Sequence, residues 1–373
     1  MRVQKLSLSN FKNYRHLEVD LAKTNLLILI GKNGQGKTNF LESLVILALS
    51  KSFQPHALKE MVNWYLHEDE TGLPEFFHLR ADIERLGKPH RLEVICGKGR
   101  KYPKTLKVDG LKTRPKDYVG KLRIVLFTPQ DLNMIMLAPT LRRRYVNILV
   151  SQVDPDYLEH LSQFQLHLRQ RNKLLSQIKE GRSRMDELSY WDEKLGHHGG
   201  YLLWKRRTTF AHLNEHLSQY YEEMSHEVVR LQLEWKKIWD AEQLEDFQLV
   251  YGSYLRERQR RDIDAESTCG GPHREDFLFR MNDRDLSHFG SRGECRSAVL
   301  ALKRAELEFL KSSTDDLPLV LFDDVFSELD VDRQKNLLAM FSTEQVFITT
   351  THLDHIPEHA QVWTVDDGQI SST

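Results

Sequence analysis

Residues 26–38 have the sequence Leu-Leu-Ile-Leu-Ile-Gly-Lys-Asn-Gly-Gln-Gly-Lys-Thr, which predicts a strand, a loop and the start of a helix. Leu26 to Ile30 form a continuous apolar run, as expected for a strand covered on both faces, and residues 39–49 are compatible with a helix. The loop fits Gly-x-x-x-x-Gly-Lys followed by Ser or Thr, a pattern whose backbone N–H groups surround phosphate oxygens at a helix N-terminus. A plain glycine-rich turn is the alternative, but the flanking strand and helix favour a phosphate-binding loop.

Composition bounds the class of protein. The chain has 373 residues, enough for about two domains. Its hydrophobic fraction of 40% and charged fraction of 29% are those of a soluble globular protein, and a net charge of −1 leaves any anion-binding surface to local clusters. The three cysteines have no Cys-x-x-Cys spacing, which argues against a zinc site and a disulfide framework. With no leader sequence and no apolar run of about 20 residues, we expect a cytoplasmic protein without a membrane partner.

The chain leaves this nucleotide region and returns to it. Residues 76–127 alternate like strands and are separated by turn signals, whereas the periodicity is helical from about residue 156 to 224 with a break at Gly181. These helices predict a short antiparallel arm. The expected division is therefore 1–150 for the first part of the lobe that holds the phosphate loop, 151–255 for a helical arm lobe and 256–373 for the rest of the first lobe.

Histidines gather in the predicted arm. His197, His198, His212 and His216 permit a metal site, but surface or seam histidines are far commoner.

A basic cluster lies in the β-rich region. Between Lys98 and Lys116 there are eight Lys or Arg residues and one acid, Asp109. Two interpretations stay open: the solvated face of a hairpin, or a surface that follows nucleic-acid phosphates. Together with a second cluster at the start of a helix-like segment, the candidate DNA contacts are Lys101, Lys104, Lys107, Arg142 and Arg143.

A second nucleotide motif follows about 280 residues after the first. Leu317 to Phe322 predict an apolar strand that ends in Asp323-Asp324, where a P-loop ATPase needs one carboxylate for Mg²⁺ and another to orient water. Val346 to Thr350 predict a further buried strand, with His352 just beyond the end at which ligands bind in open α/β sheets.

The order of these features resembles the ABC-type ATPases, in which a Ser-x-Gly signature on one subunit caps the ATP held by its neighbour. The detailed match is to the RecF family of bacterial recombination mediators, and it spans essentially the whole chain. The matching segments are Asn10–Tyr14, Gly34–Glu42, Phe127–Pro129, Pro139 with Arg142 and Arg143, Gly271–Arg274, and Ser291–Gly293.

This resemblance implies an α/β fold: an ABC-type P-loop ATPase lobe with a mixed sheet, and a smaller helical lobe with the short antiparallel arm. It also implies a slow ATPase that acts as a switch, an ATP-dependent homodimer, and binding to duplex DNA at single-strand gaps in recombinational repair and replication-fork maintenance. RecR is the implied direct partner, with RecO and RecA as indirect ones. Glu294-Cys295, Glu275 and Asn147 depart from the family pattern. Because Glu294-Cys295 follows the signature beside its serine, this departure is the one expected to affect dimer affinity or hydrolysis rate.

Site roles are carried over by residue from the motifs. Thr38 and Asp323 are expected to bind Mg²⁺ with Gln130, Asp324 to orient water, and His352 to contact the γ-phosphate. The expected ATP contacts within the subunit are Gly31, Lys32, Asn33, Gly34, Gln35, Gly36, Lys37, Thr38 and Asn39. Those from the opposite subunit are Ser291, Arg292 and Gly293.

Two other classes share these motifs. A transporter ATPase subunit would have the phosphate loop and signature, but the inserted arm disfavours it. A nuclease-associated ATPase of the overcoming-lysogenisation-defect type needs an acidic metal-binding module beyond the ATPase. A purely structural role for ATP is opposed by the Asp323-Asp324 pair.

Overall fold

The computed structural model describes residues 1–54, 56–63, 76–97, 103–236, 239, 241–326, 334, 337, 344–352 and 357–372. The chain separates into two compact units. The first combines Met1–Asp131 with Glu306–Thr373, and the second is Leu132–Ala305. The expected boundaries after residues 150 and 255 therefore both fall inside the second unit.

A mixed six-stranded sheet carries the nucleotide motifs of the first unit. Its order is β15-β14-β3-β13-β12-β8, and all neighbours are parallel except β14 and β15. The apolar runs form the buried strands because residues covered on both faces need no polar alternation. The strands are β3 (Leu26–Ile30), β8 (Ile124–Phe127), β12 (Leu319–Asp323), β13 (Val346–Thr350), β14 (Gln361–Asp366) and β15 (Gln369–Ser372).

An antiparallel sheet forms the second layer of this unit, in the order β2-β1-β4-β5-β6-β7. Its strands alternate between apolar and polar residues: Leu79 and Ala81 are buried, whereas Arg80 between them is partly exposed. The strands are β1 (Arg2–Phe11), β2 (Tyr14–Asp20), β4 (Phe76–Arg85), β5 (Lys88–Gly97), β6 (Thr105–Val108) and β7 (Leu111–Lys112).

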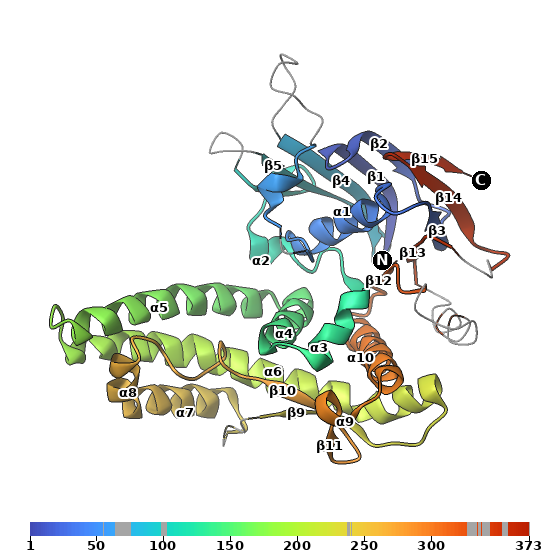
Figure 1. The fold of residues 1–373 in the computed structure, drawn as a ribbon. Helices are drawn as coiled ribbons and strands as arrows, with labels where there is room; N and C mark the ends of the chain where they lie inside the picture. Colours follow the sequence, from blue (N-terminus) through green and yellow to red (C-terminus); the bar gives the residue numbers. More distant parts are fainter. Residues whose placement is uncertain are drawn as a thin grey trace. The chain divides into compact units, whose positions relative to one another are not determined.

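Helix α1 (Lys37–Leu49) contacts both sheets of the first unit and is buried on nearly every side (Figure 1). A helix that is apolar all round is stable only inside a core, and the sequence Phe-Leu-Glu-Ser-Leu-Val-Ile-Leu-Ala-Leu provides this pattern. The phosphate loop is thereby held between a buried strand and a buried helix. Short helical turns complete the unit: η1 (Leu58–Met61), α2 (Pro115–Tyr118) and η2 (Pro129–Asp131).

The second unit is mainly helical. Helices α5 (Pro155–Lys179) and α6 (Leu188–Ser225) pack along each other as the helical arm, and α7 (Leu244–Glu257) packs on α6 (Figure 1). Close approach of α6 and α7 needs glycine, because a Cβ at Gly200 would lie 2.6 Å from the Cα of Gln248. The remaining elements are α3 (Leu132–Met136), α4 (Pro139–Val153), η3 (Met185–Glu187), β9 (Leu231–Trp235), α8 (Gln259–Asp264), β10 (Phe277–Met281), β11 (Arg284–Asp285), α9 (Leu286–Phe289) and α10 (Arg292–Ser312), which continues into the first unit.

Buried ion pairs explain why the second unit extends beyond residues 151–255. Arg142 of α4 forms a two-point ion pair with Asp276, and Arg206 of α6 binds Glu275. Breaking such a pair leaves an uncompensated buried charge, at a cost of about 3–5 kcal/mol. The segments before residue 151 and after residue 255 are therefore tied to the helical arm.

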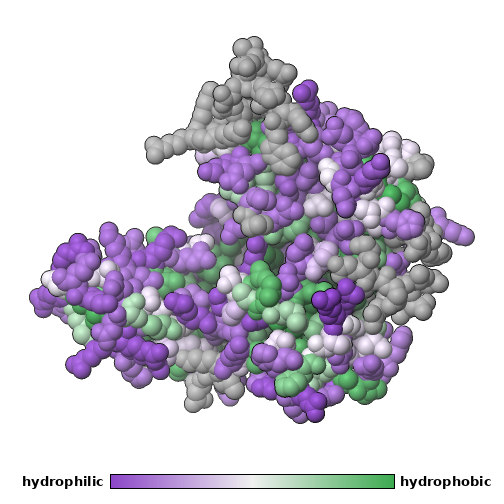
Figure 2. All heavy atoms as spheres, in the orientation of Figure 1, coloured by the Kyte–Doolittle hydropathy of each residue, from purple (hydrophilic) through white to green (hydrophobic). Residues whose placement is uncertain are grey.

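The surface of the helical arm is mostly hydrophilic in Figure 2, as expected for helices that face solvent. Among the residues that the structure describes, no helix is both long and apolar enough to cross a membrane.

Candidate nucleotide site

The carboxyl ends of three parallel strands meet at one edge of the mixed sheet. Strand β13 pairs with β3 on one side and with β12 on the other, so the phosphate loop, the Asp323-Asp324 pair and Thr349 converge. The pocket at this edge is lined by Asn33, Gly34, Gly36, Lys37, Thr38, Asn39, Asp324 and Thr349.

Two glycines give the loop its shape. Gly34 and Gly36 have φ angles of 84° and 115°, in the region that side-chain-bearing residues rarely adopt. Gly36 also has no room for a side chain, because a Cβ there would lie 2.5 Å from Nδ2 of Asn13. Helix α1 begins directly after Gly36, so its free N–H groups lie at the pocket. This geometry fits a bound phosphate group.

The ammonium group of Lys37 is held at the mouth of the loop. Its Nζ donates to the carbonyl oxygens of Gly31 at 2.6 Å and Lys32 at 2.9 Å. Burial lowers the pKa of the Lys37 ammonium, and the carboxylates of Asp324 and Asp323 partly offset this effect. A buried cation held by carbonyls in an otherwise solvent-accessible loop is suited to receive phosphate oxygens.

Asp323 has the surroundings of a divalent-cation ligand. Its Oδ1 accepts hydrogen bonds from Oγ1 of Thr38 at 2.8 Å and Oγ1 of Thr349 at 2.9 Å. Burial raises the pKa of Asp323, hydrogen bonds from the two threonines lower it, and the Asp324 charge raises it again. A carboxylate and hydroxyl so close together are the oxygen donors that Mg²⁺ prefers. Thr38 and Asp323 therefore fit the metal.

Asp324 faces the pocket from the end of β12. Its φ angle is 54°, a left-handed conformation that Asp tolerates better than most residues, and its N–H donates to the carbonyl oxygen of Thr349 at 3.0 Å. Strained backbone of this kind occurs at functional sites, where it re-aims a side chain. The structure thus gives the two neighbouring carboxylates different surroundings: one bound to hydroxyl groups and one at the pocket wall.

The turn between β1 and β2 supports the phosphate loop. Nδ2 of Asn13 donates to the carbonyl oxygen of Gln35 at 2.9 Å, and the Tyr14 hydroxyl donates to that of Gly36 at 3.0 Å. Lys12 bonds to Asn39 and forms an ion pair with Glu42, which is fully buried. The segment 10–14, singled out in sequence, therefore shapes the loop from behind.

Several predicted contacts lie outside the pocket lining. Gln130 and His352 are exposed. Lys32 contributes its carbonyl oxygen to Lys37, whereas Gln35 accepts hydrogen bonds from the N–H groups of Asp367 and Gly368. Gly31 is packed against β14, since a Cβ there would meet the Val365 oxygen at 2.4 Å. The segment Ser-Glu-Leu-Asp at residues 327–330, which follows the Asp323-Asp324 pair in the sequence, lies outside the described part of the chain.

The predicted signature forms the N-terminus of α10. The N–H of Ser291 donates to Oε2 of Glu294 at 2.6 Å, and the N–H of Glu294 donates to Oγ of Ser291 at 3.2 Å. This reciprocal capping box fixes the helix start. Ser291 and Arg292 are exposed and Gly293 is partly exposed, so the signature is open to a second molecule.

The departures from the family pattern have structural partners. Glu294 completes the capping box, and Cys295 is buried with its Sγ 3.9 Å from the sulfur of Met136. Glu275 accepts from Arg206 and from the Trp239 indole N–H, while Asn147 accepts from Arg206 and the Tyr157 hydroxyl. All of these contacts lie within the second unit.

The structure corrects part of the predicted DNA surface. Arg142 is only 5% exposed, and its guanidinium donates to the Asp276 carboxylate and to the carbonyl oxygens of Met134, Ile135 and Leu137. It is therefore not available to phosphates. Arg143 is partly exposed and donates to the Glu275 carbonyl oxygen.

The hairpin cluster is also only partly accessible. Lys104 is exposed as a residue, but its ammonium donates to O and Oγ of Ser50, and burial of that group, followed by repulsion from Lys51, lowers its pKa to about 8. Lys101 lies outside the described residues. Lys107 remains on the polar face, directly opposite Lys112 of β7.

Thr349 is the pocket residue that sequence reasoning missed. The signal was present, because Thr349-Thr350 end a predicted buried strand at the edge where the other motifs meet. Hydroxyl groups at that edge could have been assigned to the metal or to the phosphate.

The chain is similar to known proteins over nearly its whole length. Residues 2–369 match the RecF/RecN/SMC N terminal domain family. The DNA replication and repair protein RecF of Natranaerobius thermophilus is 32% identical, with 99% of this chain and 97% of that protein covered. Its counterpart in Streptococcus agalactiae is 36% identical, with 100% and 98% covered. A structure of the recombination mediator protein RecF-ATP in the RecFOR pathway matches with a TM-score of 0.89 at 28% identity, covering 100% and 97%.

Proposed function

Because the chain belongs to the RecF/RecN/SMC N-terminal domain family, as a relative of RecF proteins, we propose that it binds ATP with Mg²⁺ and closes as a dimer on DNA during repair. The convergence of Lys37, Thr38, Asp323 and Asp324 at one pocket carries this proposal. Recombinational repair near single-strand gaps is the proposed setting, with RecR as direct partner and RecO and RecA as indirect ones, since a RecF relative is described within the RecFOR pathway.

Each site residue has a role in this proposal. Lys37 would leave the carbonyls of Gly31 and Lys32 for the phosphate oxygens, and Thr38 and Asp323 would hold Mg²⁺, which neutralises charge on those oxygens. Asp324 would orient the attacking water. Gln130 is proposed to complete the Mg²⁺ coordination shell, and His352 to contact the γ-phosphate. Because both residues are exposed, they would have to move when the nucleotide binds.

The signature would act on the partner's nucleotide. Ser291 and Gly293 stand at an exposed helix N-terminus, where N–H groups and the helix dipole favour an anion. ATP would then join two subunits, and hydrolysis would release them. DNA would be retained only in the ATP state, because the nucleotide binds the closed dimer more tightly.

Replacing Ser291 with Arg tests action across the dimer. We expect Ser291→Arg to leave ATP affinity of the monomer within about twofold of the parent, because the residues that line the pocket for that ATP do not include the signature. ATP-dependent dimerisation should be abolished, since a bulky cation replaces the capping hydroxyl at the interface. Calorimetry and gel filtration measure the two effects. Joint loss of ATP binding and dimerisation would place the signature in the subunit's own pocket.

The DNA surface is proposed on the polar face of the antiparallel sheet. Lys107 and Lys112 are cross-strand neighbours on β6 and β7, so two cations lie side by side on this face, and Glu93 of β5 lies opposite Lys107 on its other side. Arg143 remains a weaker candidate because of its bond to the Glu275 carbonyl. Such contacts would recognise phosphates and not bases.

A charge reversal at the hairpin tests this surface. We expect Lys107→Glu with Lys112→Glu to weaken duplex binding in the presence of ATP and to flatten its salt dependence by about 0.9 for each phosphate that is no longer neutralised. Dimerisation should persist, because neither residue touches the nucleotide pocket. Lys23→Glu with Lys88→Glu is the control, as it changes the net charge equally at two other exposed positions. Equal weakening of DNA binding in both variants would show that the hairpin is only a solvated surface and does not contact DNA.

A further inference from the structure

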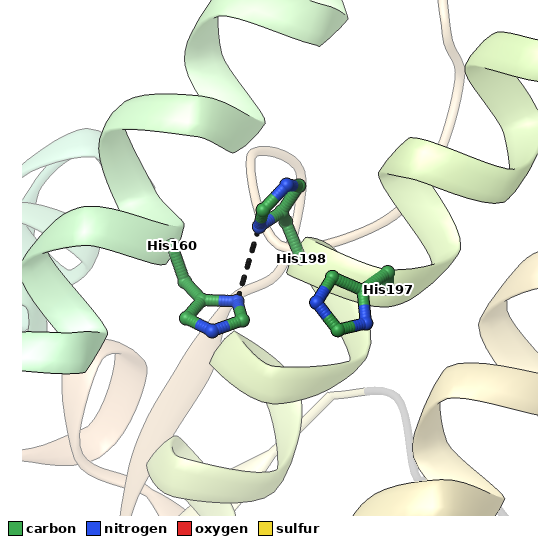
Figure 3. A group of neighbouring side chains, drawn as sticks. All are labelled: His160, His197 and His198. Carbon is green, nitrogen blue, oxygen red and sulfur yellow. Dashed lines mark hydrogen bonds between the residues drawn. The ribbon is translucent and has the colours of Figure 1, made fainter.

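Three imidazoles converge in the helical arm. His160 projects from α5, whereas His197 and His198 come from α6 (Figure 3). One ligand nitrogen from each ring lies within 4.8 Å of the others. Neither the nucleotide site nor the proposed DNA surface uses any of these residues. We propose that His160, His197 and His198 form a site for a transition-metal ion of the Zn²⁺ class, with water as the fourth ligand.

The nitrogen positions suit a metal. Nδ1 of His160 and Nδ1 of His198 are 3.1 Å apart. In a tetrahedral zinc site, metal–nitrogen bonds of about 2.0–2.1 Å place two ligand nitrogens about 3.4 Å apart. A small widening of this pair and rotation of His197 therefore bring three lone pairs onto one ion. Imidazole prefers Zn²⁺, Ni²⁺, Co²⁺ and Cu²⁺ to the hard cations Mg²⁺ and Ca²⁺.

The rings of His160 and His198 are held as neutral donors. Burial, followed by the neighbouring imidazoles, lowers the pKa of His198 to about 4 and also lowers that of His160. Neutral imidazole is the form that ligates metal, because protonation uses the lone pair. Nδ1 of one ring, His160 or His198, carries the proton of the hydrogen bond between them, and the Nδ1 of the other ring accepts it. A metal ion bound to both nitrogens would replace that proton.

Neighbouring groups fix the rings. The Tyr201 ring stacks on His160 with centroids 4.1 Å apart, and Nε2 of Gln248 from α7 lies 3.1 Å from Nδ1 of His197. With its amide turned, the side-chain oxygen of Gln248 would accept a hydrogen bond from the Nδ1–H group and leave Nε2 of His197 for the metal. His197 is exposed, which gives the ion an entry path from solvent.

Charges around the cluster also favour a cation. The carboxylates of Asp156, Asp154 and Glu159 act on His160 in the direction that stabilises positive charge, whereas Lys194 opposes this at His198. Because α5 and α6 both supply ligands, a bound ion would cross-link the two helices and stiffen the arm. The role inferred is thus structural: a metal staple between α5 and α6.

Cobalt binding tests the proposal on the full chain stripped of metal and nucleotide. We expect one Co²⁺ per chain, with the ligand-field absorption of a tetrahedral nitrogen site and without cobalt–thiolate charge transfer. His198→Gln should weaken binding by more than about 100-fold, since loss of an outer partner alone costs about 10–100-fold. His197→Gln should weaken binding to the same extent. Because His197 is exposed, this substitution should not unfold the protein, so weaker binding would reflect the lost ligand.

The control is His212→Gln with His216→Gln on the same helix. These residues are four positions apart, a spacing that can itself chelate a metal, and they are outside the three-histidine cluster. Parental Co²⁺ affinity in this variant, together with much weaker binding in His197→Gln and His198→Gln, supports the staple. Any of three results would overturn the proposed staple. They are absence of Co²⁺ binding, weaker binding only in the control variant, and a cobalt–thiolate absorption band. None of these outcomes involves ATP binding.

Discussion

Lys37→Ala is expected to weaken ATP binding by more than about 100-fold and to remove ATP-dependent dimerisation with it. The Lys37 ammonium is nearly buried and is bonded to the carbonyl oxygens of Gly31 and Lys32. Its removal leaves phosphate charge uncompensated and also removes the two hydrogen bonds that connect the ends of the loop. Charged hydrogen bonds of this kind contribute about 3 kcal/mol, which corresponds to a factor of about 100 or more.

Calorimetric titration with ATP and Mg²⁺ measures the change, and Lys32→Ala is the matched control. Lys32 is an exposed neighbour whose carbonyl, and not its side chain, serves the loop. Its replacement should leave affinity near the parental value. Parental affinity in Lys37→Ala would contradict the assignment of this pocket to the phosphates.

Asp324→Asn is expected to slow ATP hydrolysis by at least about 100-fold while ATP binding and the ATP dimer persist. A positioned general base contributes about 10²–10⁴-fold, and the amide of Asn cannot take up the proton of the attacking water. Asn tolerates the left-handed backbone at this position, so the change should be local. Because Asp has one methylene fewer than the Glu found here in most ABC ATPases, we expect even the parent to turn over slowly.

Phosphate release and gel filtration test this expectation on the same samples. Asp323→Asn is the comparison, because it removes the carboxylate bonded to Thr38 and Thr349 and should reduce the Mg²⁺ dependence of binding. Hydrolysis at the parental rate in Asp324→Asn would transfer the role of base to another residue.

Local patterns in the sequence predicted the elements that hold the site. Strands 26–30 and 346–350 occupy the predicted residues, and the mixed sheet of an ABC-type ATPase lobe is confirmed. These runs are covered on both faces, so burial alone identifies them. The family resemblance is confirmed by relatives that cover the whole chain.

Longer-range partners could not be predicted from such patterns. Arg142 resembles a surface cation in sequence, yet Asp276, 134 residues away, buries it. Lys104 and Ser50 are likewise distant in sequence, and the C-terminal hairpin of β14 and β15 has too mixed a pattern to stand out as part of the central sheet. The pairing of α4 and residues 270–276 with the helical arm depends on the same buried ions, which is why the unit boundaries differ from those expected.

The oligomeric state of the unmodified chain with and without ATP tests the account most directly. Sedimentation velocity in Mg²⁺ should show a monomer without nucleotide or with ADP, and a dimer with ATP that persists in Asp324→Asn. Ser291→Arg should remain monomeric in ATP. A mass independent of nucleotide, whether monomer or dimer, would contradict the claim that ATP joins two subunits.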